Sequence, residues 1–363
     1  MGELQINLPE ETQKTNFRGL DGLRAVSRVI VITSHVLTPF PVYNNFGLVG
    51  VYIFFVISGF LITTLLLKER LKYGNISLKG FYIRRCFRIL PVAYLFLIVL
   101  IGLNIIYKMG IPGKSFLACF LFIKHLPVLE NFNWHTGHFW SLGVEEQFYL
   151  LFPFLMVALP LRHYKRLIQC LIVVIPILSF VYVTKMETHS IHIPQPLFLV
   201  ISFFYNFLGR GTILILIGSL FSILWVTQNK LIKLVYEKAP PISSLLLFII
   251  GSLLIIRAFP WYVHFFSEAI FGIMIAFAIV LNLKEQSFFS RLLEIDLMKK
   301  IGILSYSIYI WQQIFTYEQP WFNAGNNVLL IAVNLAALTI VSILSYSLYE
   351  KKFLTYKNRF KRV

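Results

Sequence analysis

The chain has 363 residues, of which 58% are hydrophobic and only 13% are charged, and its formal net charge is +17. Soluble domains average about 45–50% apolar and about 25% charged residues, so this composition excludes an ordinary soluble globular protein. The apolar residues are gathered in blocks close to the roughly 20 residues that a bilayer span requires. The sequence therefore predicts an all-α, polytopic integral membrane protein.

Ten membrane-spanning helices are predicted along the chain. They cover residues 22–39, 46–67, 89–107, 140–160, 167–184, 208–227, 242–258, 263–283, 301–317 and 327–349. Residues 1–19 are polar and acidic, and they lack the basic-then-apolar order of a signal peptide. We expect one transmembrane domain over 22–349, a cytoplasmic tail at 1–21 and a basic cytoplasmic tail at 350–363.

The basic charge is distributed unevenly between the predicted loops. With a cytoplasmic N-terminus, the inside loops hold 25 of the 33 lysines and arginines, the outside loops hold 5, and three lie within spans. Cytoplasmic loops carry such an excess, and both termini are therefore predicted to be cytoplasmic. Topology and attraction to anionic lipid heads account for the net charge, so nucleic acid is not expected as a partner.

The cysteines are too dispersed for a metal site. Cys86, Cys119 and Cys170 lie far apart in the sequence and form no metal-type pair. The spacing argues against both a zinc site and a disulfide framework. No bound metal is expected.

The first predicted span carries two ionisable groups on one face. Arg24 and His35 are eleven residues apart, which is three helical turns within about 20° and a rise of about 16 Å. Ionisable groups inside a membrane usually face a protein interior and mark function. The alternatives are that Arg24 extends to lipid phosphates and that His35 bonds a neighbouring carbonyl. Arg28 shares the approximate face of Arg24.

A basic cluster precedes the third span. The stretch "GFYIRRCFRILP" at 80–91 contains Arg84, Arg85 and Arg88. Guanidinium groups match the geometry of phosphate oxygens, so the cluster favours a phosphate-binding site. Membrane topology and lipid binding explain such a cluster equally well.

The fourth span opens with acidic residues in an apolar run. The stretch "HFWSLGVEEQFYLLFP" at 138–153 places Glu145 seven residues after His138, on a shared helix face, and about 8 Å deep. His35 comes to a similar depth, so a carboxylate could orient its imidazole as a general base. Acidic residues in the first turn of a helix are also ordinary electrostatic features. Physical reasoning alone leaves an enzyme or a transporter with a phosphate-bearing ligand.

Six motifs together resemble the membrane acyltransferase-3 family of bacterial O-acyltransferases. In order they are "LDGLRAVSRVIVITSH", "FFVISGFLIT", "FYIRRCFRILP", "HFWSLGVEEQFYL", "IGILSYSIYIW" and "SYSLYE", and they run from residue 20 to residue 350. The chain departs from the family pattern at Gln312, where family members commonly have histidine, and at Tyr52 and Lys352.

The resemblance implies an O-acyltransferase, expected to be an O-acetyltransferase, in the inner membrane of a bacterium. The donor would be cytoplasmic acyl-CoA, expected to be acetyl-CoA, and the acceptor a hydroxyl of a surface or lipid-linked glycan. The assigned residues fall into three sets: catalytic His35, Glu145 and Arg24; donor-binding Arg84, Arg85 and Arg88; and acceptor-binding Trp140, Ser141, His138 and Arg210. The alternative is a proton-coupled transporter or flippase, although such proteins often contain inverted repeats and this sequence shows none.

Overall fold

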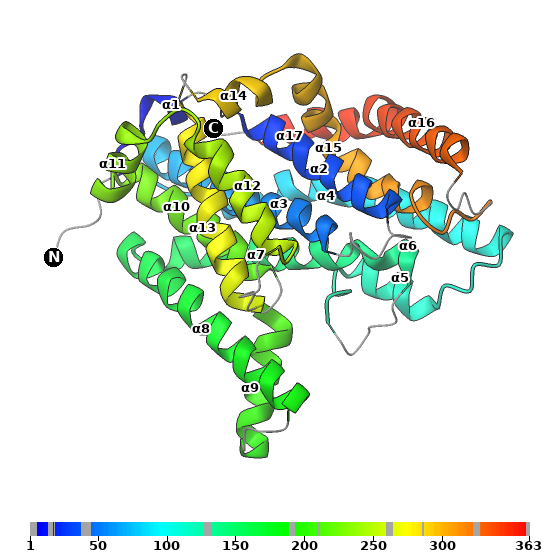
Figure 1. The fold of residues 1–363 in the computed structure, drawn as a ribbon, viewed down its shortest axis with the longest axis horizontal. Helices are drawn as coiled ribbons and strands as arrows, with labels where there is room; N and C mark the ends of the chain where they lie inside the picture. Colours follow the sequence, from blue (N-terminus) through cyan, green and yellow to red (C-terminus); the bar gives the residue numbers. More distant parts are fainter. Residues whose placement is uncertain are drawn as a thin grey trace.

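The chain folds into a bundle of helices (Figure 1). The computed structural model describes residues 6–13, 17, 19–37, 45–126, 133–188, 193–208, 211–258, 264–284, 287–321 and 327–360. Every regular element in these ranges is helical, which confirms the predicted all-α class.

The helices in chain order are α1 (Glu10–Gln13), α2 (Leu20–Val36), α3 (Phe46–Tyr73), α4 (Leu78–Ile106), α5 (Gly113–Phe120), α6 (Trp134–Gly137), α7 (Phe139–Ala158), α8 (Leu161–Thr188), α9 (Gln195–Leu208), α10 (Thr212–Val226), α11 (Lys230–Lys238), α12 (Ser243–Ile255), α13 (His264–Asn282), α14 (Phe288–Leu293), α15 (Asp296–Phe315), α16 (Val328–Leu344), the π-helical segment η3 (Ser345–Glu350) and α17 (Lys351–Asn358).

Four helical stretches in the described ranges are long and apolar enough to cross a membrane. They are α3, α4, most of α8 and the continuous run Val328–Asn358. Two further pairs of helices are bent at a short break: α9 and α10 by 64°, and α11 and α12 by 109°. If each pair forms one span, the number of candidate spans is six. The other predicted spans coincide with α2, α7, α13 and α15, which are shorter or more polar. The count of ten spans and the cytoplasmic termini stay predictions.

Helix α3 lies at the centre of the bundle, between α2 and α10. Its crossing with α10 is close because both helices present glycine: a Cβ atom on Gly59 would lie 1.9 Å from the carbonyl oxygen of Ile215, and one on Gly218 would lie 2.1 Å from that of Val56. Hydroxyl pairs Thr63–Ser219 and Thr64–Ser222, each at 2.7 Å, cross the same interface. Small residues and interhelical hydrogen bonds are what holds helices together in a bilayer.

We expect Gly59→Val to destabilise the bundle by at least about 3 kcal/mol, the upper end of the usual cost of overpacking, because the added side chain must push α10 away from α3. The matched control is Gly102→Val in α4, where nothing lies within 4 Å of an added Cβ atom. The melting temperature of the purified proteins in lipid nanodiscs measures the difference. Equal melting temperatures for both variants would contradict this account of the crossing.

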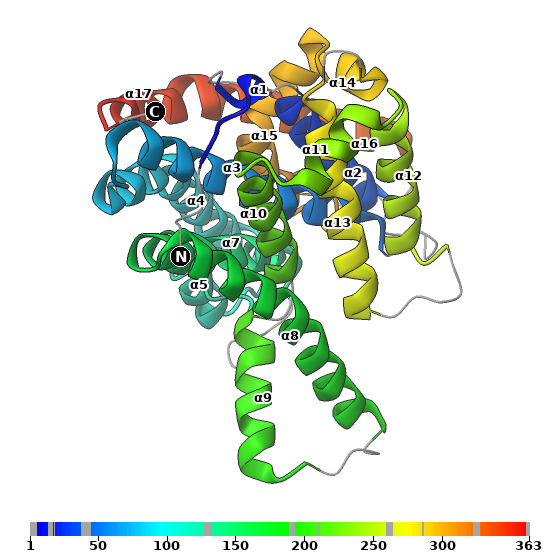
Figure 2. The same cartoon turned by 90° about the vertical axis from the view of Figure 1, so that its left-hand side faces the viewer.

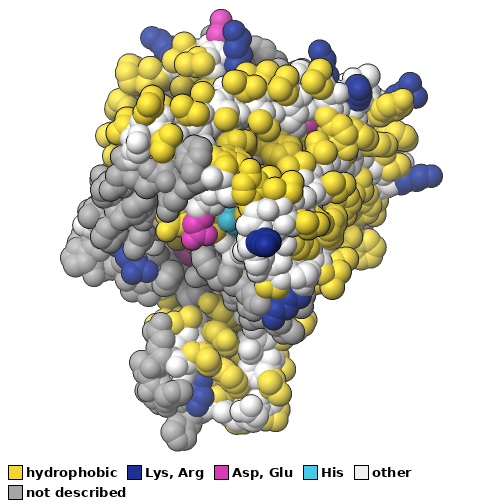
Figure 3. Space-filling view, turned by 90° about the vertical axis from the view of Figure 1, so that its right-hand side faces the viewer, with side chains coloured by type: hydrophobic (Ala, Val, Ile, Leu, Met, Phe, Trp, Pro, Cys, Tyr) yellow, Lys and Arg dark blue, Asp and Glu magenta, His cyan; other side chains and the backbone are white. Residues whose placement is uncertain are grey.

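The outer surface of the bundle is largely apolar. Val328 and Leu329 of α16 are 79% and 71% exposed, and Ile105 of α4 is 71% exposed. Apolar surface of this extent requires a partner or a membrane around it. Apolar side chains dominate the face drawn in Figure 3, and a histidine lies beside acidic side chains near its centre.

Helices α8 and α9 extend beyond the rest of the bundle as a pair (Figures 1 and 2). The aromatic rings of Tyr182 on α8 and Tyr205 on α9 stack with their centroids 4.1 Å apart. Helix α9 contains the apolar stretch at 196–208 and is bent by 64° against α10.

Candidate functional site

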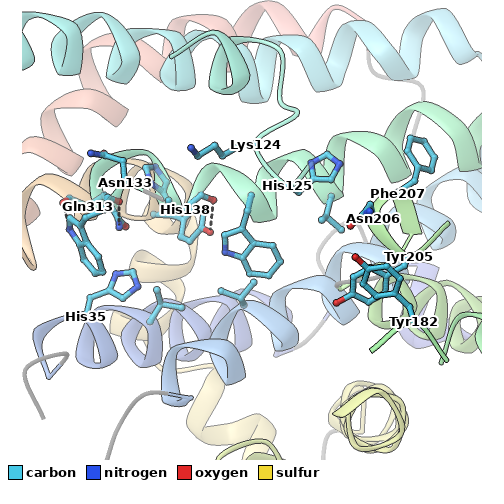
Figure 4. A pocket seen from close by; sticks show the side chains of 17 residues that line it. His35, Lys124, His125, Asn133, His138, Tyr182, Tyr205, Asn206, Phe207 and Gln313 are labelled. Carbon is cyan, nitrogen blue, oxygen red and sulfur yellow. Dashed lines mark hydrogen bonds between the residues drawn. The ribbon is translucent and has the colours of Figure 1, made fainter. Parts of the chain in front are cut away.

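A pocket of about 630 Å³ lies between α2, α3, α7, α8, α9 and α15, and the segments at 124–125 and 133–138 also line it. Figure 4 shows His35, His138 and Gln313 toward one end, and Tyr182, Tyr205 and Asn206 toward the other. Pockets that bind small molecules in proteins occupy about 300–1,000 Å³. The size is therefore suitable for a ligand larger than a single acetyl group.

His35 reaches this pocket from the last turn of α2. Its imidazole packs edge-on against Trp134, with ring centroids 4.9 Å apart, and the side-chain amide of Gln312 lies beside it. Among the described residues, its buried Nδ1 atom has no hydrogen-bond partner. Packing against Trp134 and Gln312 thus fixes the orientation of the ring at the pocket.

His138 is the second histidine of the pocket, at the residue preceding α7. Its side chain is buried, and in the described part of the chain neither ring nitrogen has a hydrogen-bond partner. Phe96 and Tyr309 hold the ring in edge-on contacts, at 5.1 Å and 5.6 Å between centroids. A buried polar group without a partner is costly, so the ring is suited to a bound polar ligand.

Two further histidines, in the segment between α5 and α7, pack around the same region. The side chains of His125 and Gln147 are hydrogen-bonded at 2.5 Å, and a ring nitrogen of His135 lies 2.7 Å from the carbonyl oxygen of Glu318. Burial lowers the pKa of His125 to about 4, which keeps this imidazole uncharged at neutral pH. Residues 125–138 contain three histidines, and this clustering was visible in the sequence. The motifs drew attention to His138 alone.

Glu145 lies in a buried network of hydroxyl groups. Its carboxylate accepts hydrogen bonds from the Ser58 hydroxyl at 2.5 Å and from the Tyr149 hydroxyl at 3.3 Å. The described hydrogen bonds do not join it to His35, so the sequence-based hypothesis of a direct His35–Glu145 pair is not supported by this geometry. Ser58 of α3 is thus a direct partner of the carboxylate.

Arg28 connects the pocket with the Glu145 network. Its guanidinium is buried and lies 3.9 Å from the ring centroid of Phe54 and 4.1 Å from that of Tyr309. Tyr309 also lines the pocket, and the charges of Arg28 and Glu145 interact. The sequence placed Arg28 only on the approximate face of Arg24, because a helical position does not show which side chain will be buried.

Three of the predicted cationic residues gather near the network. Arg24 forms an ion pair with Asp21 at 2.7 Å and lies within electrostatic range of Arg88. The guanidinium of Arg85 lies 5.0 Å from the ring of Tyr149 and interacts with the charge of Glu145. These arginines create a positively charged region that reaches the carboxylate network.

Arg84 is engaged elsewhere. Its guanidinium forms an ion pair with Glu69 at 3.0 Å and donates to the carbonyl oxygen of Phe360 at 2.7 Å. These bonds fix α4 to the end of α3 and to the chain beyond α17. The structure therefore gives Arg84 a structural part and does not bring it together with Arg24.

The acceptor-binding assignments meet different outcomes. Trp140 and His138 line the pocket. The Ser141 hydroxyl is hydrogen-bonded to Tyr309 and donates to the carbonyl oxygen of His138. It therefore holds two residues that line the pocket. Arg210 lies outside the described residues.

The two C-terminal hydroxyl motifs meet in the fold. Glu350 of η3 accepts hydrogen bonds from Ser307 at 2.5 Å and from Ser345 at 3.0 Å. Its carboxylate lies within electrostatic range of Arg88. The segments "LSYSIYIW" and "LSYSLYE" thus join α15 to η3 beside one of the predicted donor-binding arginines.

Comparison with known proteins identifies relatives over most of this chain. The peptidoglycan O-acetyltransferase OatA of Listeria monocytogenes is 27% identical over 361 residues, which cover 91% of this chain and 54% of OatA. A Staphylococcus aureus protein named as a candidate O-acetyltransferase is 26% identical over 362 residues, covering 92% of this chain and 57% of its own. This chain spans little more than half the length of these relatives. No solved structure matches it.

The family match covers the helices that build the site. The acyltransferase domain family matches residues 17–350, from three residues before α2 to the end of η3. The matched region therefore contains the pocket, the Glu145 network and the arginines beside it. With its several apolar helices, the chain is a multi-pass membrane protein, and it belongs to the acyltransferase-3 family.

Proposed function

We propose that this protein is an O-acetyltransferase of a bacterial cell membrane, which moves an acetyl group from cytoplasmic acetyl-CoA to a hydroxyl of a glycan at the outer face. The observation that carries the proposal is the connection between two half-sites. The pocket of His35 and His138 is linked through Tyr309 and Arg28 to a buried carboxylate surrounded by arginines. A reaction that joins ligands from opposite sides of a membrane needs such a connection.

The predicted topology supports the direction of transfer. The pocket residues come from the predicted outer end of the first span, the large outer loop and the outer ends of the fifth and ninth spans. Arg24, Arg85 and Arg88 belong to segments predicted near the inner surface. The acyl donor would approach from the arginine side, and the acceptor would enter the pocket.

The donor half-site is built for an anion. Arg85 and Arg88 would bind phosphate oxygens of acyl-CoA, since guanidinium groups form paired hydrogen bonds with them. Arg24, held by Asp21, would orient the donor between them and Arg28. In this arrangement Arg84 serves the fold and is left out of the donor site.

The acceptor half-site supplies a base. A ring nitrogen of His35 would take the proton of the acceptor hydroxyl while the hydroxyl oxygen bonds to the thioester carbonyl carbon. The carbon–sulfur bond then breaks, and the CoA thiolate takes up the proton from His35. Trp140 and His138 would hold the acceptor sugar. Glu145 would act as a positioning residue, because it balances the charge of Arg28 and anchors Ser58 and Tyr149.

The donor assignment is tested by Arg88→Met, with Arg166→Met on the exposed surface of α8 as control. We expect the KM for acetyl-CoA to rise about tenfold or more in Arg88→Met, because a charge-assisted hydrogen bond contributes about 1.5–3 kcal/mol. The control keeps the wild-type value. Membranes with labelled acetyl-CoA and native glycan provide the assay.

Two results would contradict the proposal. Wild-type membranes that leave the label on CoA would overturn acetyl transfer itself, and altered glycan export without acetylation would favour the transporter. An unchanged KM in Arg88→Met would remove Arg88 from the donor site.

A further inference from the structure

The pocket extends well beyond the neighbourhood of His35. Its far end is formed by Tyr182 of α8 and by Tyr205 and Asn206 of α9, with Trp140 lining the pocket as well (Figure 4). A volume of about 630 Å³ is larger than one sugar ring beside His35 requires. The far end is therefore a separate part of the cavity with its own lining.

The tyrosines at this end are held in a stack of three rings. Tyr182 lies between Tyr205, at 4.1 Å between centroids and 20° between planes, and Phe198, at 5.7 Å and 5°. Tyrosine offers a large, rigid surface that loses little conformational entropy on binding, because only two side-chain torsions must be fixed. The stack joins α8 to α9 and covers both faces of the Tyr182 ring, so a face available for stacking belongs to Tyr205, while Tyr182 fixes that ring and also lines the cavity.

Polar groups accompany the aromatic surface. Both tyrosines carry hydroxyl groups, and the side chains of Tyr182, Tyr205 and Asn206 are all partly exposed. The Asn206 amide donates to Ser202 at 3.4 Å, and its side-chain oxygen is an acceptor. Flat aromatic surface next to hydroxyl and amide groups suits a sugar ring, whose C–H face is apolar and whose edge carries hydroxyls.

We propose that Tyr182, Tyr205 and Asn206 form a second sugar-binding subsite, so that the acceptor is an oligosaccharide or polymer of at least two sugars. The sugar to be acetylated lies beside His35, and a neighbouring sugar of the same chain stacks at the far end. This inference rests on the proposed glycan acceptor. It adds that the protein distinguishes glycans by their length and does not act on a free monosaccharide alone.

A hydrocarbon chain is the competing occupant. A smaller apolar cavity of about 160 Å³ lies between α8 and α9, and Tyr205 lines both cavities. Its walls are aliphatic and aromatic side chains, and Ser179 and Tyr205 are its only lining residues with a polar side-chain atom. The subsite itself faces the larger cavity, whose lining includes the polar side chains of His35 and Asn206, and this favours a sugar over a lipid tail.

The test compares two ligands, N-acetylglucosamine and its β-1,4-linked tetramer. Their affinities for the whole protein in nanodiscs are measured in the absence of acyl donor. We expect the wild type to bind the tetramer at least about tenfold more tightly than the monomer, and Tyr205→Leu to abolish most of this preference while leaving monomer affinity unchanged. Tyr205→Phe retains the ring and should retain the preference. Phe180→Leu, an exposed aromatic on α8, is the control and binds as wild type does.

The possible results test the second sugar-binding subsite independently of acetyl transfer. Equal affinities for monomer and tetramer in the wild type, or an undiminished preference in folded Tyr205→Leu, would overturn the subsite. A monosaccharide with an eight-carbon chain that binds as tightly as the tetramer and weakens in Tyr205→Leu would assign the far end to hydrocarbon and also overturn it. Because acetyl-CoA is absent, failure of acetyl transfer would not alter any of these results.

Discussion

Replacing His35 by alanine is expected to lower acetyl transfer by about 100- to 10,000-fold, the usual contribution of a general base. The imidazole is the pocket's proton acceptor in the proposed reaction, and Trp134 and Gln312 hold it in place. The substitution removes the ring at the end of α2, where the side chain faces a cavity. The fold should therefore tolerate it.

The measurement is the amount of acetyl ester on extracted glycans, by mass spectrometry, from cells with matched amounts of protein in the membrane. His163→Ala, an exposed histidine of α8, serves as the control and is expected to acetylate normally. Wild-type acetylation in His35→Ala would show that His35 fills space in the pocket and has no part in the chemistry.

Glu145→Gln is expected to have the largest effect on stability, about 3–5 kcal/mol, which is typical when one partner of a buried charged network is removed. The carboxylate balances the charges of Arg28 and Arg85 and accepts from Ser58 and Tyr149. Glutamine keeps the shape but leaves the buried guanidinium of Arg28 without the charge of Glu145 and weakens the negative charge beside Arg85. Glu145→Asp keeps the charge and should be less destabilising.

A comparison of melting temperatures in nanodiscs tests this expectation. Glu237→Gln is the control, because Glu237 pairs with Lys233 at 3.8 Å on an exposed face, where ion pairs contribute about 0–1 kcal/mol. If Glu145→Gln has the same melting temperature as the wild type, the carboxyl group of Glu145 is uncharged in the folded protein. Its role would then be that of a neutral hydrogen-bond partner.

Hydropathy and helical periodicity predicted much of the fold. Long apolar runs specified α3, α4, α8 and α16, because backbone groups in a bilayer are satisfied inside a helix. The count of spans was less predictable. Bends between α9 and α10 and between α11 and α12 depend on tertiary packing, and so does the short length of α2.

The site was predictable in its residues more than in its contacts. Matched depth suggested that His35 and Glu145 form a pair, but depth along two helices does not determine which faces meet. The structure places Ser58 and Tyr149 around Glu145, and Trp134 and Gln312 around His35. The burial of Arg28 beside Tyr309 and the aromatic stack of Tyr182 were not predicted, because both depend on neighbours that are distant in the sequence.

The central claim is that donor and acceptor meet from opposite sides of the membrane. The most direct measurement uses sealed vesicles with the protein in one orientation, labelled acetyl-CoA only on the side of Arg24 and Arg88, and the oligosaccharide acceptor only on the other. The account predicts labelled glycan in wild-type vesicles and none in His35→Ala vesicles, with the acetyl-CoA retained on its own side. Transfer that occurs only when both substrates share one side would contradict it.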